Sequence, residues 1–539
     1  MDFVCNFPFI SIILSLFSGP LCSVLSGKWA KRINTVVIIM IGILSVFVLA
    51  YVGRTGEAFV YRMGHFPAPW GNEIRVGILE AFMACFFCVV MLLCMAAGGR
   101  EREVQIHENK QNLYYVMVNL LLCSLLALIY TNDLFTAYVF VEINTISACG
   151  LIMIRQNGRT IEAATRYMIM SLLGSGLLLL GICFLYDLTG HLLMSNLKEQ
   201  VHILVETGQY HIPLMVSVGL MSVGLAMKSA LYPFHAWLPD AYGYSTLSSA
   251  AILSSLVSKG YIFLLIKIFY RVVGFEILTE NKVANVLFVF GIVGMIMGSL
   301  NAIQEEHITR MIAYSSVAQI GYIYMGIGLA TQEGMVASIY HVVSHAATKS
   351  LLFVAASGLA AASGGGTRYR DLVGSGYRNK LAGIAFTVGS LSMVGMPMFS
   401  GFISKLFFAQ AAIGHTHKML PTFIALAIST VLNAAYFMKM VICIYSPRYG
   451  RDEYAIQNLN LVPSKDIEEK RDIVSDKDVV LKEDSISKKV DMQQKNDMDK
   501  KVDTAKNVAL LCFIILNFVL GLNSEPMIRL IQKGLSMFG

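Results

Sequence analysis

Long apolar runs recur along this chain and restrict what it can fold into. A helix needs roughly 20 apolar residues to cross a bilayer core about 30 Å thick, and about fourteen runs of suitable length occur in the 539 residues. The chain is therefore expected to be a polytopic membrane protein. The expected spans cover residues 5–26, 34–53, 77–98, 113–130, 133–154, 163–186, 212–232, 246–272, 284–303, 311–330, 335–362, 381–412, 421–446 and 507–523.

Composition and pattern agree that these spans are helices. With 56% hydrophobic and 14% charged residues, the chain has too little polar surface to cover a soluble globule of this size. Lipid offers no partner to unpaired backbone groups, and the runs lack the period-two alternation of an outer-membrane barrel, so the fold class is all-α. The N-terminus has no basic region or cleavage site typical of a signal peptide and is expected to be a retained span.

Charge and cysteine usage limit the function further. The net charge of +7 is not concentrated in a Lys/Arg patch, so no nucleic-acid partner is expected. The ten cysteines are scattered singly, and the pair Cys85 and Cys88 has no second pair to complete a metal site. Phosphate-binding loops, iron–sulfur cysteine clusters and haem ligand pairs are not recognisable either, so neither a metal nor another cofactor is expected.

Lysine and arginine predict the orientation of the chain, because they are enriched in cytoplasmic loops. Loops after odd-numbered spans carry more of them, which predicts that these loops are cytoplasmic and that both termini lie outside the cell membrane. The odd loops hold Lys28, Lys31, Arg32, Arg100, Arg102, Lys110, Arg155, Arg159, Arg166, Arg310, Arg368, Arg370, Arg378 and Lys380. The opposite side holds mainly Arg54, Arg62, Arg75, Lys198, Arg271, Lys282, Lys418, Arg529 and Lys533.

Residues 447–506 interrupt the apolar pattern with a charged insertion, predicted to be cytoplasmic. From residue 451 the segment mixes Lys with Asp and Glu and has almost no aromatic residues, so it cannot form a core of its own. A disordered loop and a partly helical insertion both fit, and disorder is the favoured interpretation.

Several ionisable residues fall inside the expected spans, where each costs about 2.5–3.5 kcal/mol on insertion scales. Glu142 lies near the middle of the fifth span with no charge nearby in sequence, so a basic partner on another helix is expected. Lys228 precedes Pro233, which interrupts its helix, and Lys405 lies in a second run broken around Pro397 and Gly401. Two broken helices with a lysine each are typical of transporters built from repeated halves.

The remaining members of this set lie between the two breaks. Lys259 follows three serines that favour its hydration, Ser254, Ser255 and Ser258. His341, His345 and Lys349 are spaced four apart and therefore share one helix face, along which a proton can pass. His235 and Asp240, near the end of the seventh span, are secondary candidates. Any one buried Glu–Lys pair can simply hold helices together, but a series of such residues favours transport.

At these residues the sequence resembles the antiporter-like membrane subunits shared by respiratory complex I (NADH-quinone oxidoreductase), multisubunit Na⁺/H⁺ antiporters and membrane-bound hydrogenases. The resemblance rests on Lys228 with Trp237-Leu-Pro-Asp-Ala, on Ala313-Tyr-Ser-Ser-Val-Ala-Gln-Ile-Gly-Tyr, on His341 through Lys349 followed by Leu351-Leu-Phe, and on Ser400-Gly-Phe-Ile-Ser-Lys405. Tyr242-Gly-Tyr-Ser departs from the family, which usually has a histidine and prolines there. Leu432-Asn-Ala-Ala-Tyr and Pro67-Ala-Pro-Trp-Gly are closer to the antiporter and hydrogenase branches.

The resemblance implies an architecture and a set of roles. It implies fourteen helices with two inverted five-helix repeats and broken seventh and twelfth helices. The divisions are 1–112 (three N-terminal helices), 113–273 (first repeat), 284–446 (second repeat), 447–506 (insertion) and 507–539 (last helix and tail). By position it implies a proton pathway through Glu142, Lys228, Lys259, His341, His345, Lys349 and Lys405. It also implies partner subunits, among them homologous antiporter-like ones.

Three functions remain open at this point. The first is proton translocation within a redox-driven or Na⁺/H⁺ antiporter complex, in which this chain holds no catalytic redox centre of its own. The second is a quinone-binding redox subunit, and the third is a structural scaffold without transport. The transported ion and the driving reaction cannot be read from the residues.

Overall fold

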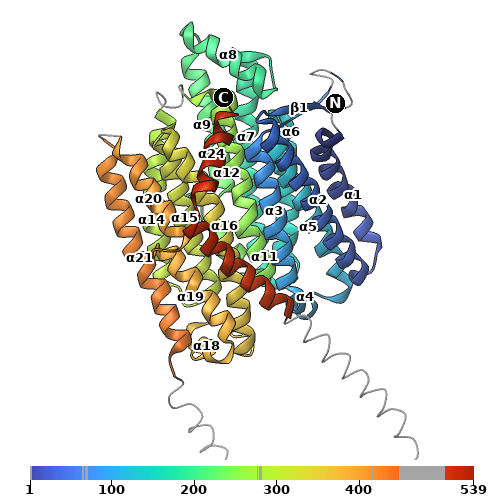
Figure 1. Cartoon of the computed structure of the whole chain (residues 1–539), viewed down its shortest axis with the longest axis vertical. Coiled ribbons are helices and arrows are strands. Elements are labelled where there is room, and N and C mark those ends of the chain that lie inside the picture. The colour runs from blue at the N-terminus through green and yellow to red at the C-terminus, as the bar shows by residue number, and fades with distance from the viewer. Residues whose placement is uncertain are drawn as a thin grey trace, which may run out of the picture.

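The computed structural model describes residues 3–63, 66, 71–275, 277, 282–414, 417–447 and 504–538. In this part of the chain, 12 helices are long and apolar enough to cross a membrane (Figure 1). These spans are Phe3–Val24 (with α1, Phe7–Val24), α2 (Gly27–Thr55), α3 (Ile78–Ala97), Glu108–Tyr130 (with α5, Gln111–Tyr130), α6 (Leu134–Met153), α7 (Gly158–Thr189), α9 (His211–Lys228), Leu247–Val273, α14 (Lys282–Gln304), α16 (Gln332–Ala362), α21 (Met419–Tyr445) and Thr504–Leu522.

Two further segments complete the expected set of spans. Helix α15 (Ile308–Gly328) has 21 residues and is almost entirely buried. Helices α19 (Lys380–Val394) and α20 (Ser400–Ile413) are too short to cross alone and follow each other as the two halves of one broken span. The all-α polytopic fold predicted from the sequence is therefore confirmed.

Both predicted helix breaks are present. Helix α9 ends at Lys228, and regular helix resumes only at α10 (Leu238–Tyr244), as expected for a segment containing Pro233, which lacks a backbone donor. Helix α19 ends at Val394 and is followed by Gly395, whose φ of 89° is a left-handed conformation that glycine adopts without strain. Gly401 was expected to contribute to this break, but it lies inside α20, where it packs against the backbone of α19.

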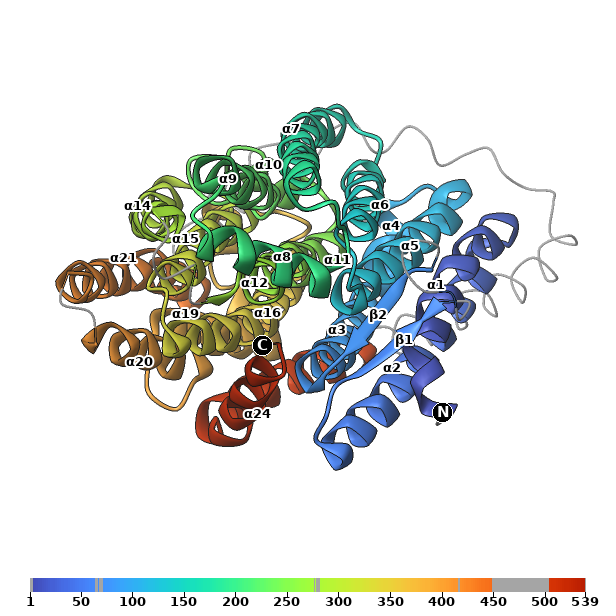
Figure 2. The same cartoon turned by 90° about the horizontal axis from the view of Figure 1, so that it is seen from above.

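Two spans in the middle of the bundle are completely buried in protein. They are Leu247–Val273 and α16, and Figure 2 shows α12 (Ser258–Ile268) and α16 surrounded by the other helices. The first is built from α11 (Leu247–Ile252), a π-helical turn at Leu253–Val257, α12, and a second π-helical turn at Phe269–Val273. Lys259 lies on the first of these spans, and His341 and His345 lie on the second. The outer helices shield all three residues from lipid.

The two ends of the bundle differ. Both chain ends lie beside β1 and α8 (Met194–Glu206), whereas α4 (Gly99–Gln105) and α18 (Ser375–Arg378) lie at the opposite end, here called the α4 end (Figure 1). A chain with an even number of spans must have both termini at the same end of the bundle. The remaining short helices are η1 (Phe3–Asn6), η3 (Glu108–Lys110), α17 (Tyr369–Leu372) and α24 (Glu525–Ser536).

Some features were not expected from the sequence. An antiparallel hairpin of β1 (Phe59–Arg62) and β2 (Glu73–Val76) precedes α3, with Phe59 opposite Val76. The helix α8 also lies outside the predicted spans. Pro67-Ala-Pro-Trp and all but residues 447 and 504–506 of the charged insertion lie outside the described residues.

Candidate functional site

Seven ionisable residues inside the bundle are called the buried row: Glu142, Lys228, Lys259, Lys349, His345, His341 and Lys405. Glu142 and Lys228 form its first part. Glu142 lies on α6 and Lys228 at the last residue of α9, and Lys228 Nζ is 3.6 Å from Glu142 Oε1. The Lys228 side chain is fully buried, while that of Glu142 keeps 25% of its surface exposed. Lys228 Nζ also donates a 2.7 Å hydrogen bond to Thr145 Oγ1 on α6. Lys228 is thus the basic partner that the sequence predicted for Glu142, and it has a second, neutral acceptor.

Lys259 comes next, at the second residue of α12, directly after the first π-helical segment. Its Nζ donates to the carbonyl of Ser254 at 2.5 Å and to Ser258 Oγ at 3.2 Å. A π-helical turn displaces backbone carbonyls from the regular helical pattern, and here one of those carbonyls accepts from the lysine. Tyr261, two residues on, lies with its ring 5.6 Å from Lys228 Nζ, and its hydroxyl donates to Asn144 Oδ1 at 2.9 Å.

Serines link Lys259 to Lys349 on α16. Ser254 Oγ lies 3.3 Å from Ser316 Oγ on α15. The preceding residue, Ser315, accepts a hydrogen bond from Lys349 Nζ, which also donates to the carbonyl of Ile312 at 2.8 Å. Both lysines are fully buried, and the hydroxyls of Ser315 and Ser316 share one acceptor with the Lys349 amine, the carbonyl of Ile312.

The two histidines continue the row along α16. Their rings are stacked, with centroids 5.9 Å apart and planes 9° from parallel, as the four-residue spacing predicts. His341 Nδ1 lies 2.9 Å from Ser404 Oγ on α20. Within the described residues, His341 Nε2 and both ring nitrogens of His345 have no hydrogen-bond partner, although buried polar atoms normally have one.

Lys405 ends the row at the second helix break. It follows Ser404 on α20, and its Nζ donates to the carbonyl of Val394 at 2.6 Å and to Thr430 Oγ1 at 2.9 Å. The ring of Tyr322 lies 5.5 Å from the same nitrogen. The carbonyl of Val394 is the last one in α19, and the helix break leaves it without a backbone N–H donor. The Lys405 amine takes the place of that donor.

The two secondary candidates lie apart from these contacts. His235 stacks on Tyr232 at 5.0 Å in the segment between α9 and α10. Asp240 forms ion pairs with Arg166, at 2.7 Å, and with Arg310. On α10, it therefore holds together two arginines from two other helices, α7 and α15, at the α4 end.

A second group of buried charges was missed by sequence reasoning. Glu80 on α3 pairs with Arg271, and both side chains are almost completely buried. One helical turn before Arg271, Lys267 donates to three carbonyls at the end of α5, those of Leu128, Ile129 and Thr131. Arg271 lies within the expected span 246–272, as the structure confirms, and its count among the loop charges of the opposite side is wrong. The spacing of Lys267 and Arg271 at i and i+4 was the available signal, because it places both on one helix face.

The described residues contain no group of three or more His, Cys, Asp or Glu side chains able to hold a metal ion. The row instead offers amines, imidazoles and one carboxylate linked by hydroxyl and carbonyl oxygens. Such groups accept and release protons, and they lie at membrane depth in a helical bundle with two broken helices. By its fold and its site, the protein is therefore a polytopic helical membrane protein with ionisable side chains in its interior.

The chain belongs to the NADH:quinone oxidoreductase/Mrp antiporter transmembrane family, whose model matches residues 131–433. That match includes all seven residues of the row, and it confirms the resemblance seen in the sequence. Among curated relatives, NADH-quinone oxidoreductase subunit N of Desulforudis audaxviator is 32% identical over 72% of this chain and 75% of its own. A Na(+)/H(+) antiporter subunit of Alkalihalophilus pseudofirmus is 24% identical over 78% of this chain and 82% of its own.

Solved structures share the fold across the whole chain. A chain of the Mrp complex from Dietzia sp. superposes with a TM-score of 0.81 at 21% identity, covering 99% of this chain and 97% of that one. A chain of an archaeal membrane-bound sulfane sulfur reductase gives a TM-score of 0.78 at 23% identity, with the same coverage. Both belong to multisubunit membrane complexes.

Proposed function

We propose that this chain is the proton-translocating, antiporter-like subunit of a multisubunit membrane complex. Protons pass along the row Glu142, Lys228, Lys259, Lys349, His345, His341 and Lys405. The observation that carries this proposal is the continuity of the row. Lys228 contacts both Glu142 and Thr145, and Lys259 and Lys349 are connected residue by residue through Ser254, Ser316 and Ile312. The rings of His345 and His341 are stacked, and the ring of Tyr322 lies against both His341 and Lys405.

The acceptors around the lysines support transfer rather than permanent pairing. Lys259, Lys349 and Lys405 donate to serine or threonine hydroxyls and to backbone carbonyls. A neutral amine can stay in such a site, because a hydroxyl can donate to the amine nitrogen as well as accept from it. Cations in series repel one another at low dielectric. A proton that arrives at one lysine therefore favours release from the next.

Glu142 and Lys228 are suited to start or end such a relay. Lys228 has two alternative partners on α6, the carboxylate of Glu142 and the hydroxyl of Thr145. Movement of the ammonium group away from Glu142 removes the charge that favours its protonated form. A change in this pair is thus expected to determine whether a proton enters the row.

The relatives suggest how the row is driven. One relative is named as a subunit of NADH-quinone oxidoreductase and another as a subunit of a Na(+)/H(+) antiporter, so the driver is either a redox reaction in partner subunits or exchange with sodium. In this proposal the chain lies in the cell membrane with both termini outside and the α4 end in the cytoplasm. The units 113–273 and 284–446 are its two repeats.

Replacement of Lys349 by methionine in the intact complex tests the proposal. The change removes the charge in the middle of the row, and we expect proton transport to fall at least about tenfold, since a positioned proton-transfer group contributes on the order of 10²–10⁴-fold. Lys380→Met is the matched control, because Lys380 is exposed at the first residue of α19.

The rival functions predict other results. Unchanged proton transport in an assembled Lys349→Met complex contradicts the proposal. Loss of assembly in that variant, with normal transport by whatever complex still forms, indicates a structural scaffold. Labelling of this chain by a photoreactive quinone indicates a redox role.

A further inference from the structure

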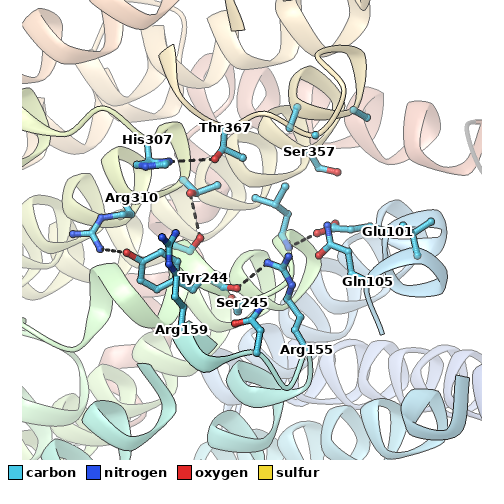
Figure 3. A pocket seen from close by; sticks show the side chains of 18 of the residues that line it. Glu101, Gln105, Arg155, Arg159, Tyr244, Ser245, His307, Arg310, Ser357 and Thr367 are labelled. Carbon is cyan, nitrogen blue, oxygen red and sulfur yellow. Dashed lines mark hydrogen bonds between the residues drawn. The ribbon is translucent and has the colours of Figure 1, made fainter. Parts of the chain in front are cut away.

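A cleft of about 890 Å³ opens at the α4 end of the bundle (Figure 3). Residues from several segments that are far apart in sequence form its walls. Arg155 comes from the connection between α6 and α7, and Arg159 lies in the first turn of α7. His307 and Thr367 lie across from them, while Glu101 on α4 lies next to Gln105. The proposed function leaves this cleft without a role.

The cleft is basic, and most of its cationic groups are held by other contacts. Arg155 donates to the carbonyl of Tyr244 at 3.0 Å, and Arg159 lies 5.7 Å from the ring of the same tyrosine. Arg310 is paired with Asp240 and Glu305. Among the described residues that line the cleft, Glu101 is the one carboxylate.

Glu101 is held at the junction of the cleft and the buried span Leu247–Val273. Its Oε1 accepts a 2.5 Å hydrogen bond from the backbone N–H of Leu247 at the first residue of α11. Burial raises the pKa of the Glu101 carboxyl, against the lowering effects of this N–H and of Lys506, Arg102 and Arg155. The group therefore takes up a proton at less acidic pH than an exposed glutamate does.

Serine side chains lie inward of Glu101. A small gap without room for a water molecule adjoins the cleft, and Glu101, Ser248, Val354 and Ser357 are among the residues that line it. Ser357 is on α16, eight residues from Lys349, and a rise of 1.5 Å per residue puts the two about 12 Å apart along the helix axis. Ser350, one turn inward from Val354, lies beside Cys94 together with Ser255 of the π-helical segment.

We propose that Glu101 is the site of proton uptake, which collects protons from the cleft and delivers them past Ser248 and Ser350 to the buried Lys349 and Lys259. This inference rests on the proposed function. The carboxylate takes a proton from water in the cleft and returns to its ionised form when that proton moves on to a lysine amine. The basic lining keeps the ionised form available between transfers.

Glu101→Gln in the intact complex tests this role, with Glu103→Gln as the matched control. Glu103 is two residues away on the same short helix, and it pairs at 3.3 Å with Lys31 at a partly exposed position. We expect Glu101→Gln to slow proton transport at least about tenfold and to remove the pH dependence that the carboxyl imposes on the rate. Glu103→Gln should leave both unchanged, and Glu101→Asp should restore part of the rate.

The outcomes separate the two proposals. If Glu101→Gln transports normally while Lys349→Met does not, protons enter elsewhere and only the uptake site is refuted. If both variants transport normally, the proposed function fails as well. Equal slowing by Glu101→Gln and Glu103→Gln, with a wild-type pH profile in both, shows a structural effect of α4 and also refutes the uptake site.

Discussion

The buried pair of Glu80 and Arg271 allows a quantitative test of what holds the helices together outside the row. The side chains are 0% and 1% exposed, and Glu80 Oε2 also accepts from the backbone N–H of Gly77 at 3.1 Å. Glu80→Gln keeps the size of the side chain and an oxygen for Gly77, but it removes the charge opposite Arg271. We expect it to lower the free energy of unfolding by about 3–5 kcal/mol, as when one partner of a buried ion pair is lost.

A double-mutant cycle isolates the pair from other effects. Arg271→Met alone should also destabilise, because it leaves the Glu80 carboxylate buried without its cation. The double variant should regain much of the loss, since a buried ion pair replaced at both positions by uncharged groups is often close to neutral. The assay is equilibrium denaturant titration of the intact complex in lipid bicelles.

An exposed pair supplies the control for this cycle. Arg529 and Glu525 are spaced i and i+4 on α24, with side chains 75% and 71% exposed. Glu525→Gln should change the free energy of unfolding by only about 0.3–0.5 kcal/mol. Glu80→Gln could lower the free energy of unfolding by no more than this control, or the two single effects could simply add in the double variant. Either result would show that the buried pair does not stabilise the packing of the two helices.

Two further predictions concern the helix break and the first lysine. Gly401→Ala places a methyl group against the backbone of α19 and should destabilise the subunit by about 3 kcal/mol or more. The amount of assembled complex on a native gel measures this, with Gly414→Ala, which meets open space, expected to assemble normally. Thr145→Val removes the neutral acceptor of Lys228 and should slow transport roughly tenfold, since a hydrogen bond to a charged group contributes about 1.5–3 kcal/mol. Thr165→Val, at an exposed hydroxyl that bonds its own helix, should transport normally, and equal rates for both variants would count against a role for the acceptor.

The sequence was sufficient for the spans, and it singled out the residues that we propose for the row, because both follow from local rules. Apolar length identifies a membrane helix, and the cost of burying a charge identifies Glu142, Lys228, Lys259 and Lys405 wherever they fall in a span. The four-residue spacing of the α16 histidines likewise predicts that they share a helix face, where their rings are found stacked.

Long-range pairing is what the sequence could not supply. Glu80 and Arg271 are 191 residues apart, and each lies near the end of its span, where a charged side chain is ordinarily expected to reach solvent. Only the packing of α3 against the span Leu247–Val273 shows that they meet. The same holds for Glu101, whose position beside Leu247 depends on how α4 folds back onto the bundle.

If protons cross along the buried row, removal of its middle charge must lower the number of protons moved per turnover of the driving reaction. In proteoliposomes that contain the intact complex, Lys349→Met should lower this ratio while Lys380→Met leaves it at the wild-type value. An unchanged ratio in Lys349→Met would show that protons cross without the group at the centre of the row, and the proposed pathway would then be wrong.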